Sequence, residues 1–132
     1  MYQPISRFQH AVVDYIYAPL VALTPFAFGF TSDRNALILA WVVAGGLLAA
    51  SLTTRTELGV VRVIPYRVHL IADFFGGFVF LAAPWLFGFA SDAPARNVFL
   101  VMGLMNITAG LLSRPEEMPV TTPATPVTPL AP

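Results

Sequence analysis

The sequence predicts an all-α polytopic membrane protein, with four transmembrane helices arranged as two parallel tandem helix-hairpin repeats. Two observations carry this prediction. The first is composition, because 57% of the 132 residues are hydrophobic and 11% are charged, against about 25% charged residues in an ordinary soluble domain. The second is a set of motifs that occurs twice along the chain, which is the mark of an internal repeat.

Four apolar runs are long enough to cross a bilayer. Asp14 and Asp73 are the only charged residues among them, and the runs cover residues 11–30, 36–52, 70–90 and 97–112. A run of about 17–25 apolar residues matches a helix across a hydrocarbon layer of ~30 Å. Buried core helices of a soluble protein are the alternative, but no polar face remains to cover them. We expect the first run to stay in the mature protein, because it lacks the small-residue cleavage site of a signal peptide.

The repeat has an offset of 59 residues. Its pattern is His, three residues, Asp, ten residues, Pro-aromatic-x-Phe-Gly-Phe, one residue and Ser-Asp, and it begins at His10 and again at His69. With small gaps the match continues into the following helix, where Gly46 pairs with Gly110. Such a series of coincidences in order indicates a duplication.

Each copy is expected to form a helix, a short turn and a second helix. The turns contain Thr31-Ser32-Asp33 and Ser91-Asp92, whose side-chain oxygens can accept hydrogen bonds from the free amides of the next helix. Pro94 falls in the first turn of the fourth helix, where its missing N–H costs little. Because the turns are short, the two helices of each copy should be antiparallel neighbours.

The Pro-aromatic-x-Phe-Gly-Phe motif falls at the end of the first helix of each copy. Proline weakens the helix ladder, glycine permits the turn, and a large aromatic ring favours the membrane interface. We interpret the motif as an interfacial anchor with a helix stop, and a ligand-binding aromatic cage as the alternative. The anchor residues are Pro25, Phe26, Gly29, Pro84, Trp85 and Gly88.

Arginine counts predict the orientation. Five arginines flank the helices on the side of the two termini and the central loop, and two, Arg34 and Arg96, lie on the other side. The positive-inside rule therefore places both termini in the cytoplasm. Residues 1–114 form the predicted membrane domain, with repeat one at about 8–53 and repeat two at about 67–113. Residues 115–132 are rich in Pro and Thr, which predicts an extended or disordered cytoplasmic tail.

Two short segments resemble the Ser-Pro-Trp signature of the SPW repeat family of small bacterial integral membrane proteins. They are Thr24-Pro25-Phe26 and Ala83-Pro84-Trp85, so the Ser is replaced in both copies and the Trp is present only in the second. The resemblance covers roughly residues 8–113. It implies a multi-pass protein of the bacterial inner membrane, and it carries no catalytic residue.

Two His/Asp pairs are the candidates for chemistry. His10 with Asp14, and His69 with Asp73, have the i, i+4 spacing that puts each pair on one helix face. If the two helices touch, two imidazoles and two carboxylates could converge to bind a divalent metal or to relay protons. The favoured interpretation is structural: an Asp near the cytoplasmic edge that stabilises a helix start and bonds a neighbouring Arg or His.

Small residues mark the candidate helix contacts. In lipid, close backbone approach at small residues is a main source of helix association. The candidates are Gly45, Gly46, Gly103 and Gly110, and both contacts within one chain and contacts between chains stay open.

Composition and motifs narrow the function. The absence of Cys excludes disulfides, thiolate zinc sites and Cys nucleophiles, and a net charge of zero argues against nucleic-acid binding. No nucleophile–base pair, P-loop or dinucleotide fingerprint is present, so we expect neither an enzyme nor a cofactor. We expect a structural or accessory protein of the lipid bilayer that associates with itself or with other membrane subunits. The alternative is a small transporter or channel that uses the paired His and Asp residues.

Overall fold

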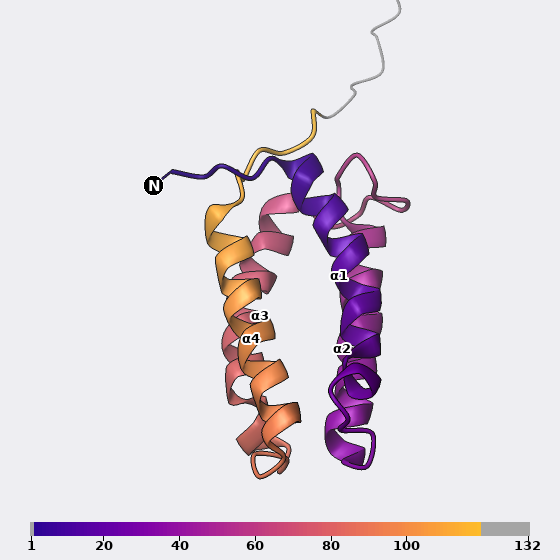
Figure 1. Ribbon diagram of the computed structural model, residues 1–132. Coiled ribbons are helices and arrows are strands. Elements are labelled where there is room, and N and C mark those ends of the chain that lie inside the picture. Colours follow the sequence, from indigo (N-terminus) through magenta and orange to yellow (C-terminus); the bar gives the residue numbers. More distant parts are fainter. Residues whose placement is uncertain (1, 120–132) are drawn as a thin grey trace, which may run out of the picture.

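The computed structural model describes residues 2–119, and this part of the chain folds into four helices (Figure 1). The all-α class is confirmed. Helix α1 pairs with α2 and α3 with α4, and the two hairpins stand side by side. The N-terminus, the central loop and the described end of the chain lie together at one end, here called the terminal end. The two tight turns lie at the other, the turn end. The helices are α1 (Arg7–Ala27), α2 (Arg34–Thr53), α3 (Tyr66–Leu86) and α4 (Ala93–Leu112).

Three of the four helices, α2, α3 and α4, are long and apolar enough to cross a membrane. Helix α1 is not among these candidates in the described residues. By length and composition, the structure therefore supports three of the four predicted spans. Helix α3 carries Arg67, His69 and Asp73 in its first two turns and still qualifies, so the charged start of α1 is not the difference. Along the rest of the helix, α1 has less apolar residues at four equivalent positions: Tyr15, Tyr17, Pro19 and Thr24, where α3 has Phe74, Gly76, Phe78 and Ala83.

The two hairpins are built alike. Helices α1 and α3 both have 21 residues, α2 and α4 both have 20, and every helix bound is repeated after 59 residues. The same offset therefore holds through the second helices without any gap. The gapped pairing of Gly46 with Gly110 was wrong, because the helix bounds place Gly46 opposite Met105.

Both turns close in the same way. Gly29 and Gly88 adopt the left-handed region, with φ of 74° and 77°. The next residue then turns back, so that Phe30 N–H donates to the Pro25 carbonyl at 3.0 Å, and Phe89 N–H donates to Pro84 at 2.9 Å. This six-to-one bond is the Schellman helix stop, which glycine favours because it has no Cβ.

The following helices begin on the two predicted caps. Asp33 accepts from the amides of Asn35 and Ala36, each at 3.1 Å, and Asp92 accepts from the amide of Ala95 at 3.0 Å. Pro94 lies in the first turn of α4. Among the turn residues predicted to offer cap oxygens, Asp33 and Asp92 are the N-caps, and the position of the proline is confirmed.

At the terminal end, two isolated backbone bridges join the hairpins. Ile5 pairs with Ser113, and Ile64 pairs with Thr54. The two bridges are again 59 residues apart, so the start of each hairpin is tied to the end of the other.

The described beginning of the tail caps α3. Pro65 supplies no side-chain cap, and the Glu117 carboxylate instead accepts from the amides of Tyr66 at 3.1 Å and Arg67 at 2.8 Å. A carboxylate at a helix N-terminus accepts hydrogen bonds from the free amides, and its negative charge is stabilised by the helix dipole. The rest of the predicted tail, residues 120–132, lies outside the described residues.

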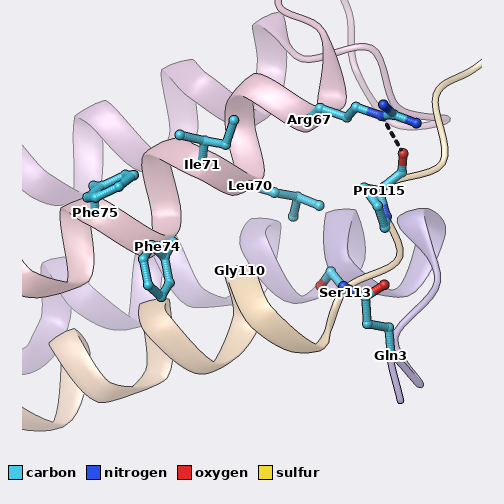
Figure 2. Close-up of a pocket in the computed structure, with 9 residues that line it drawn as sticks. All are labelled: Gln3, Arg67, Leu70, Ile71, Phe74, Phe75, Gly110, Ser113 and Pro115. Atoms are coloured by element: carbon cyan, nitrogen blue, oxygen red, sulfur yellow. Dashed lines mark hydrogen bonds between the residues drawn. The ribbon is translucent and has the colours of Figure 1, made fainter. Parts of the chain in front are cut away.

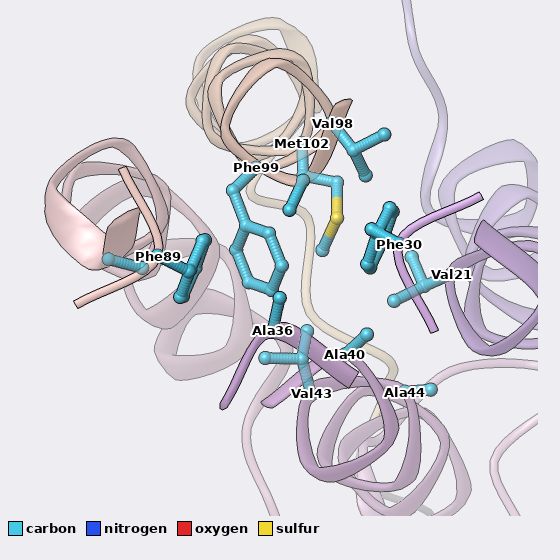
Figure 3. Packing of buried hydrophobic residues seen from close by; sticks show 12 residues of the cluster. Val21, Phe30, Ala36, Ala40, Val43, Ala44, Phe89, Val98, Phe99 and Met102 are labelled. Atoms are coloured by element: carbon cyan, nitrogen blue, oxygen red, sulfur yellow. The ribbon is translucent and has the colours of Figure 1, made fainter. Parts of the chain in front are cut away.

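The interior is divided along its length. Near the turn end it is apolar, with the buried Phe30, Phe89 and Phe99 packed against small residues and Met102 (Figure 3). Near the terminal end it is polar, and this half holds the candidate site.

A buried histidine and aspartate cluster between the hairpins

Four polar side chains meet between α1 and α3 in the terminal half of the interior. His10 and Asp14 come from α1, and His69 and Asp73 come from α3. His10 is 2% exposed, His69 5% and Asp73 9%, while Asp14 is half-buried. The i, i+4 spacing puts each pair on one helix face, and the fold turns the two faces toward each other. We call these four residues the His/Asp cluster.

The nitrogen and oxygen atoms of the cluster form a closed ring. His10 Nε2 lies 3.5 Å from Asp14 Oδ2 and 3.1 Å from Asp73 Oδ2. His69 Nε2 lies 3.1 Å from Asp14 Oδ2 and 3.4 Å from Asp73 Oδ2. Each imidazole nitrogen therefore faces one carboxylate of its own helix and one of the other hairpin. The cluster joins the hairpins as well as the helices.

The outer nitrogen of each imidazole contacts a buried hydroxyl. His10 Nδ1 is 2.7 Å from Ser113 Oγ, and His69 Nδ1 is 2.8 Å from Thr54 Oγ1. Ser113 and Thr54 are the residues that end α4 and α2, and they too lie 59 positions apart. Sequence reasoning missed both hydroxyls, although the repeat offset could have revealed them as an equivalent pair.

The Thr54 hydroxyl decides which nitrogen of His69 carries a proton. Thr54 Oγ1 donates its single hydrogen to the Ala50 carbonyl at 2.7 Å, so toward His69 it can act only as an acceptor. His69 Nδ1 is therefore the donor in that contact. A neutral His69 then presents a lone pair at Nε2 toward the two carboxylates.

In the described part of the chain, most of the nitrogen and oxygen atoms that face one another inside the His/Asp cluster lack hydrogen-bond partners. Within residues 2–119, His10 Nε2, His69 Nε2 and Asp73 Oδ2 are buried without any hydrogen-bond partner. They lie 3.1–3.5 Å from the facing atoms of the cluster, but these contacts do not have hydrogen-bond geometry. Buried polar atoms normally have a hydrogen-bond partner, so these atoms need another source of stabilisation.

Tyr66 and Ser51 complete the surroundings. The Tyr66 ring is buried, stacks on His69 with a centroid distance of 6.4 Å, and meets His10 edge-on at 5.7 Å. Ser51 Oγ from α2 lies 3.4 Å from Asp14 Oδ2. All four helices or their caps thus contribute a residue to the site.

The arginines near the cluster bind elsewhere. Arg7 donates to both carboxylate oxygens of Glu57, at 3.1 and 2.7 Å, and these bonds lower the pKa of Glu57. Arg67 donates through Nε to the Pro115 carbonyl at 2.9 Å. Of the two partners considered for Asp14 and Asp73, the structure supplies His and not Arg.

A shallow pocket lies just outside the cluster. It has a volume of about 390 Å³ and opens between α3, the end of α4 and the two chain ends (Figure 2). Ser113, whose hydroxyl contacts His10, also lines this pocket. Ser113 therefore lies between His10 and this pocket.

The anchor residues lie at the turn end, away from the cluster. Phe26 and Trp85 are each 61% exposed, whereas Pro25 and Pro84 are buried inside their helices. Phe26 stacks on the exposed Trp41 of α2, with a centroid distance of 6.3 Å.

The four candidate packing glycines separate into two groups. A Cβ on Gly103 would lie 2.6 Å from the Gly77 carbonyl oxygen, and one on Gly110 would lie 2.9 Å from the Leu70 carbonyl oxygen. These two glycines therefore lie in the close contact between α3 and α4. A Cβ on Gly45 or Gly46 would meet no described atom within 4 Å, so this part of α2 faces outward.

Comparison with known proteins gives one match. A family model described as the SPW repeat domain matches residues 8–113, which is most of the chain. No curated protein and no solved structure matches the chain.

Proposed function

The chain belongs to the SPW repeat domain family, and from that premise we propose a structural or accessory role in the membrane. In this proposal the protein crosses the bilayer four times and associates with copies of itself or with other membrane subunits. The observation that carries the proposal is the outward face of α2, where Gly45 and Gly46 meet no described atom.

Helix α1 is proposed as the fourth span. Its outward side chains are apolar: Val13, Ile16, Leu20 and Leu23 are 49–57% exposed. Its polar residues His10 and Asp14 face the cluster, and polar groups inside a membrane protein normally face its interior. Helix α3 buries the equivalent pair, His69 and Asp73, and is itself a candidate span, so this pair does not prevent α1 from crossing the membrane.

The proposed orientation has both termini in the cytoplasm. By the helix bounds, five arginines lie at the terminal end and two, Arg34 and Arg96, lie at the turn end. The positive-inside rule favours the arginine-rich side as cytoplasmic. The matching caps, turns and bridges support two tandem copies of one hairpin with the same topology.

The association surface is a groove on α1 and α2. It has a volume of about 400 Å³, and its lining residues are Ala18, Pro19, Ala22, Trp41, Ala44, Gly45 and Leu48. Small residues let helix backbones approach closely in lipid, where the hydrophobic effect does not drive helices together. The contact between α3 and α4 uses glycine in this way, and the groove offers α2 the same contact with a further helix.

Association can be tested by native mass measurement after extraction into a mild detergent. We expect the wild type to run as an oligomer or with a copurifying membrane subunit, and Gly45→Leu/Gly46→Leu to run as a monomer. Gly76→Leu is the matched control, because Gly76 also faces open space but lies on α3, outside the groove. A wild type that is a monodisperse monomer without a partner contradicts the proposal.

Transport is the second candidate, and the convergence of two imidazoles and two carboxylates supports it. Chains of Asp and His inside membrane proteins serve as proton relays. If the protein moves protons or cations, Asp14→Asn/Asp73→Asn should abolish the flux in proteoliposomes while the helical circular dichroism is retained. Wild-type protein that supports no flux removes this candidate.

A further inference from the structure

We propose that the His/Asp cluster binds one divalent transition-metal ion. The ligands are Nε2 of His10 and His69 and the Oδ2 atoms of Asp14 and Asp73. This inference goes beyond the association role and does not depend on it, because the site is complete within one chain.

The distances between the ligand atoms fit a metal site. The four sides of the ring measure 3.1–3.5 Å. These four distances are close to the edges of about 3.3–3.4 Å between neighbouring ligand atoms in a tetrahedral site with metal–ligand bonds of about 2.0–2.1 Å, which has six such edges. Ligand atoms of His10, His69 and Asp73, all of them buried residues, also lie within 4.8 Å of one another.

The unpaired inner atoms support an ion in the ring. In the described part of the chain, both Nε2 atoms are almost fully buried and lack a hydrogen-bond partner, although each has two carboxylate oxygens within 3.5 Å. An imidazolium proton lies along one direction, so it serves one oxygen well at most. An ion between the four atoms can bind both lone pairs and both carboxylates at once.

The outer contacts of the imidazoles are those of metal ligands. A metal-bound His usually donates its other ring N–H to an oxygen, which fixes the ring and directs the free lone pair toward the metal. His69 donates in this way to Thr54 Oγ1, and His10 makes the equivalent contact with Ser113 Oγ. Because the two hydroxyls end α2 and α4, the helix packing itself holds the rings in position.

The charges also balance. Two carboxylates and a divalent ion sum to zero with neutral imidazoles, and a neutral group is far cheaper to keep in an apolar interior than a charged one. Two imidazoles and two carboxylates suit Zn²⁺, Fe²⁺ or Mn²⁺, and we use Zn²⁺ as the probe. Four protein ligands are typical of a structural site, so the ion would join α1 to α3.

The test is metal binding by the full chain purified in detergent and stripped with a chelator. We expect one Zn²⁺ per chain by elemental analysis, and a tetrahedral visible spectrum when Co²⁺ is added. Asp73→Asn should abolish this binding. Glu57→Gln should leave it unchanged, because Glu57 pairs with Arg7 outside the cluster.

A second variant retains all four ligands. Thr54→Val removes only the hydroxyl that orients His69, and we expect about 10–100-fold weaker Zn²⁺ binding, as for other outer-shell substitutions. Thr53→Val is its control, because the Thr53 hydroxyl bonds only carbonyls of its own helix. Folded wild type that binds neither Zn²⁺ nor Co²⁺ at micromolar concentration overturns the proposal. So does binding that Asp73→Asn leaves intact.

Discussion

Replacing Asp73 with alanine should lower the free energy of unfolding of the detergent-purified protein by about 3–5 kcal/mol. Asp73 Oδ2 lies within 3.5 Å of Nε2 in both His10 and His69. Removing one partner from a buried charged set leaves the others uncompensated, and this accounts for the size of the loss. The loss is expected whether the cluster holds a metal ion or shared protons, because both arrangements need the second carboxylate.

The measurement is unfolding by heat or denaturing detergent, followed by circular dichroism. Asp33→Ala is the control for the size of the effect, because it also removes a carboxylate, but one that only caps α2. Loss of such a cap costs about 1 kcal/mol. If Asp73→Ala costs no more than Asp33→Ala, the cluster does not hold the hairpins together.

The contact between α3 and α4 should also be sensitive to a single added methyl group. A Cβ on Gly77 would lie 2.6 Å from the Gly103 carbonyl oxygen and 2.9 Å from the Ile107 amide nitrogen. Both are backbone atoms, so the helices must move apart. We expect Gly77→Ala to cost about 2–3 kcal/mol, at the upper end of overpacking substitutions.

The neighbouring glycine supplies the control for this prediction. A Cβ on Gly76 meets no described atom within 4 Å, and Gly→Ala inside a helix stabilises it by roughly 0.5–1 kcal/mol. Gly76→Ala should therefore unfold at the same temperature as the wild type or above it. Equal behaviour of the two variants would contradict the close packing of α3 on α4.

Much of the local structure could be predicted because it depends on neighbours in the chain. Asp33 and Asp92 cap helices through amides two or three residues away, and Gly29 and Gly88 supply the left-handed turn that follows a helix end. The capping of α3 by Glu117 could not be predicted in this way, because it joins residues 50 positions apart. Glu117 also lies in a segment whose composition favours an extended chain.

The offset of 59 residues was readable from the sequence, but the alignment drawn from it was not fully correct. Identical residues suggested gaps in the second helices and paired Gly46 with Gly110. In the structure the bounds of all four helices keep the offset of 59, because the caps and helix ends set the register. The same offset pairs Thr54 with Ser113, which sequence reasoning left unused.

The sequence by itself determined that this protein is an all-α chain with long apolar helices, with two similar turns and with His and Asp pairs on single helix faces. Periodicity, composition and cap chemistry depend on residues that are close together in the chain, so they can be recognised in the sequence without knowledge of the fold. Only the tertiary structure decided that α1 and α3 bring the four polar side chains into one ring. It alone also decided that Gly103 is packed while Gly46 faces outward. These outcomes depend on which helix faces meet, and the residue pattern of a single helix does not reveal which distant part of the chain it contacts.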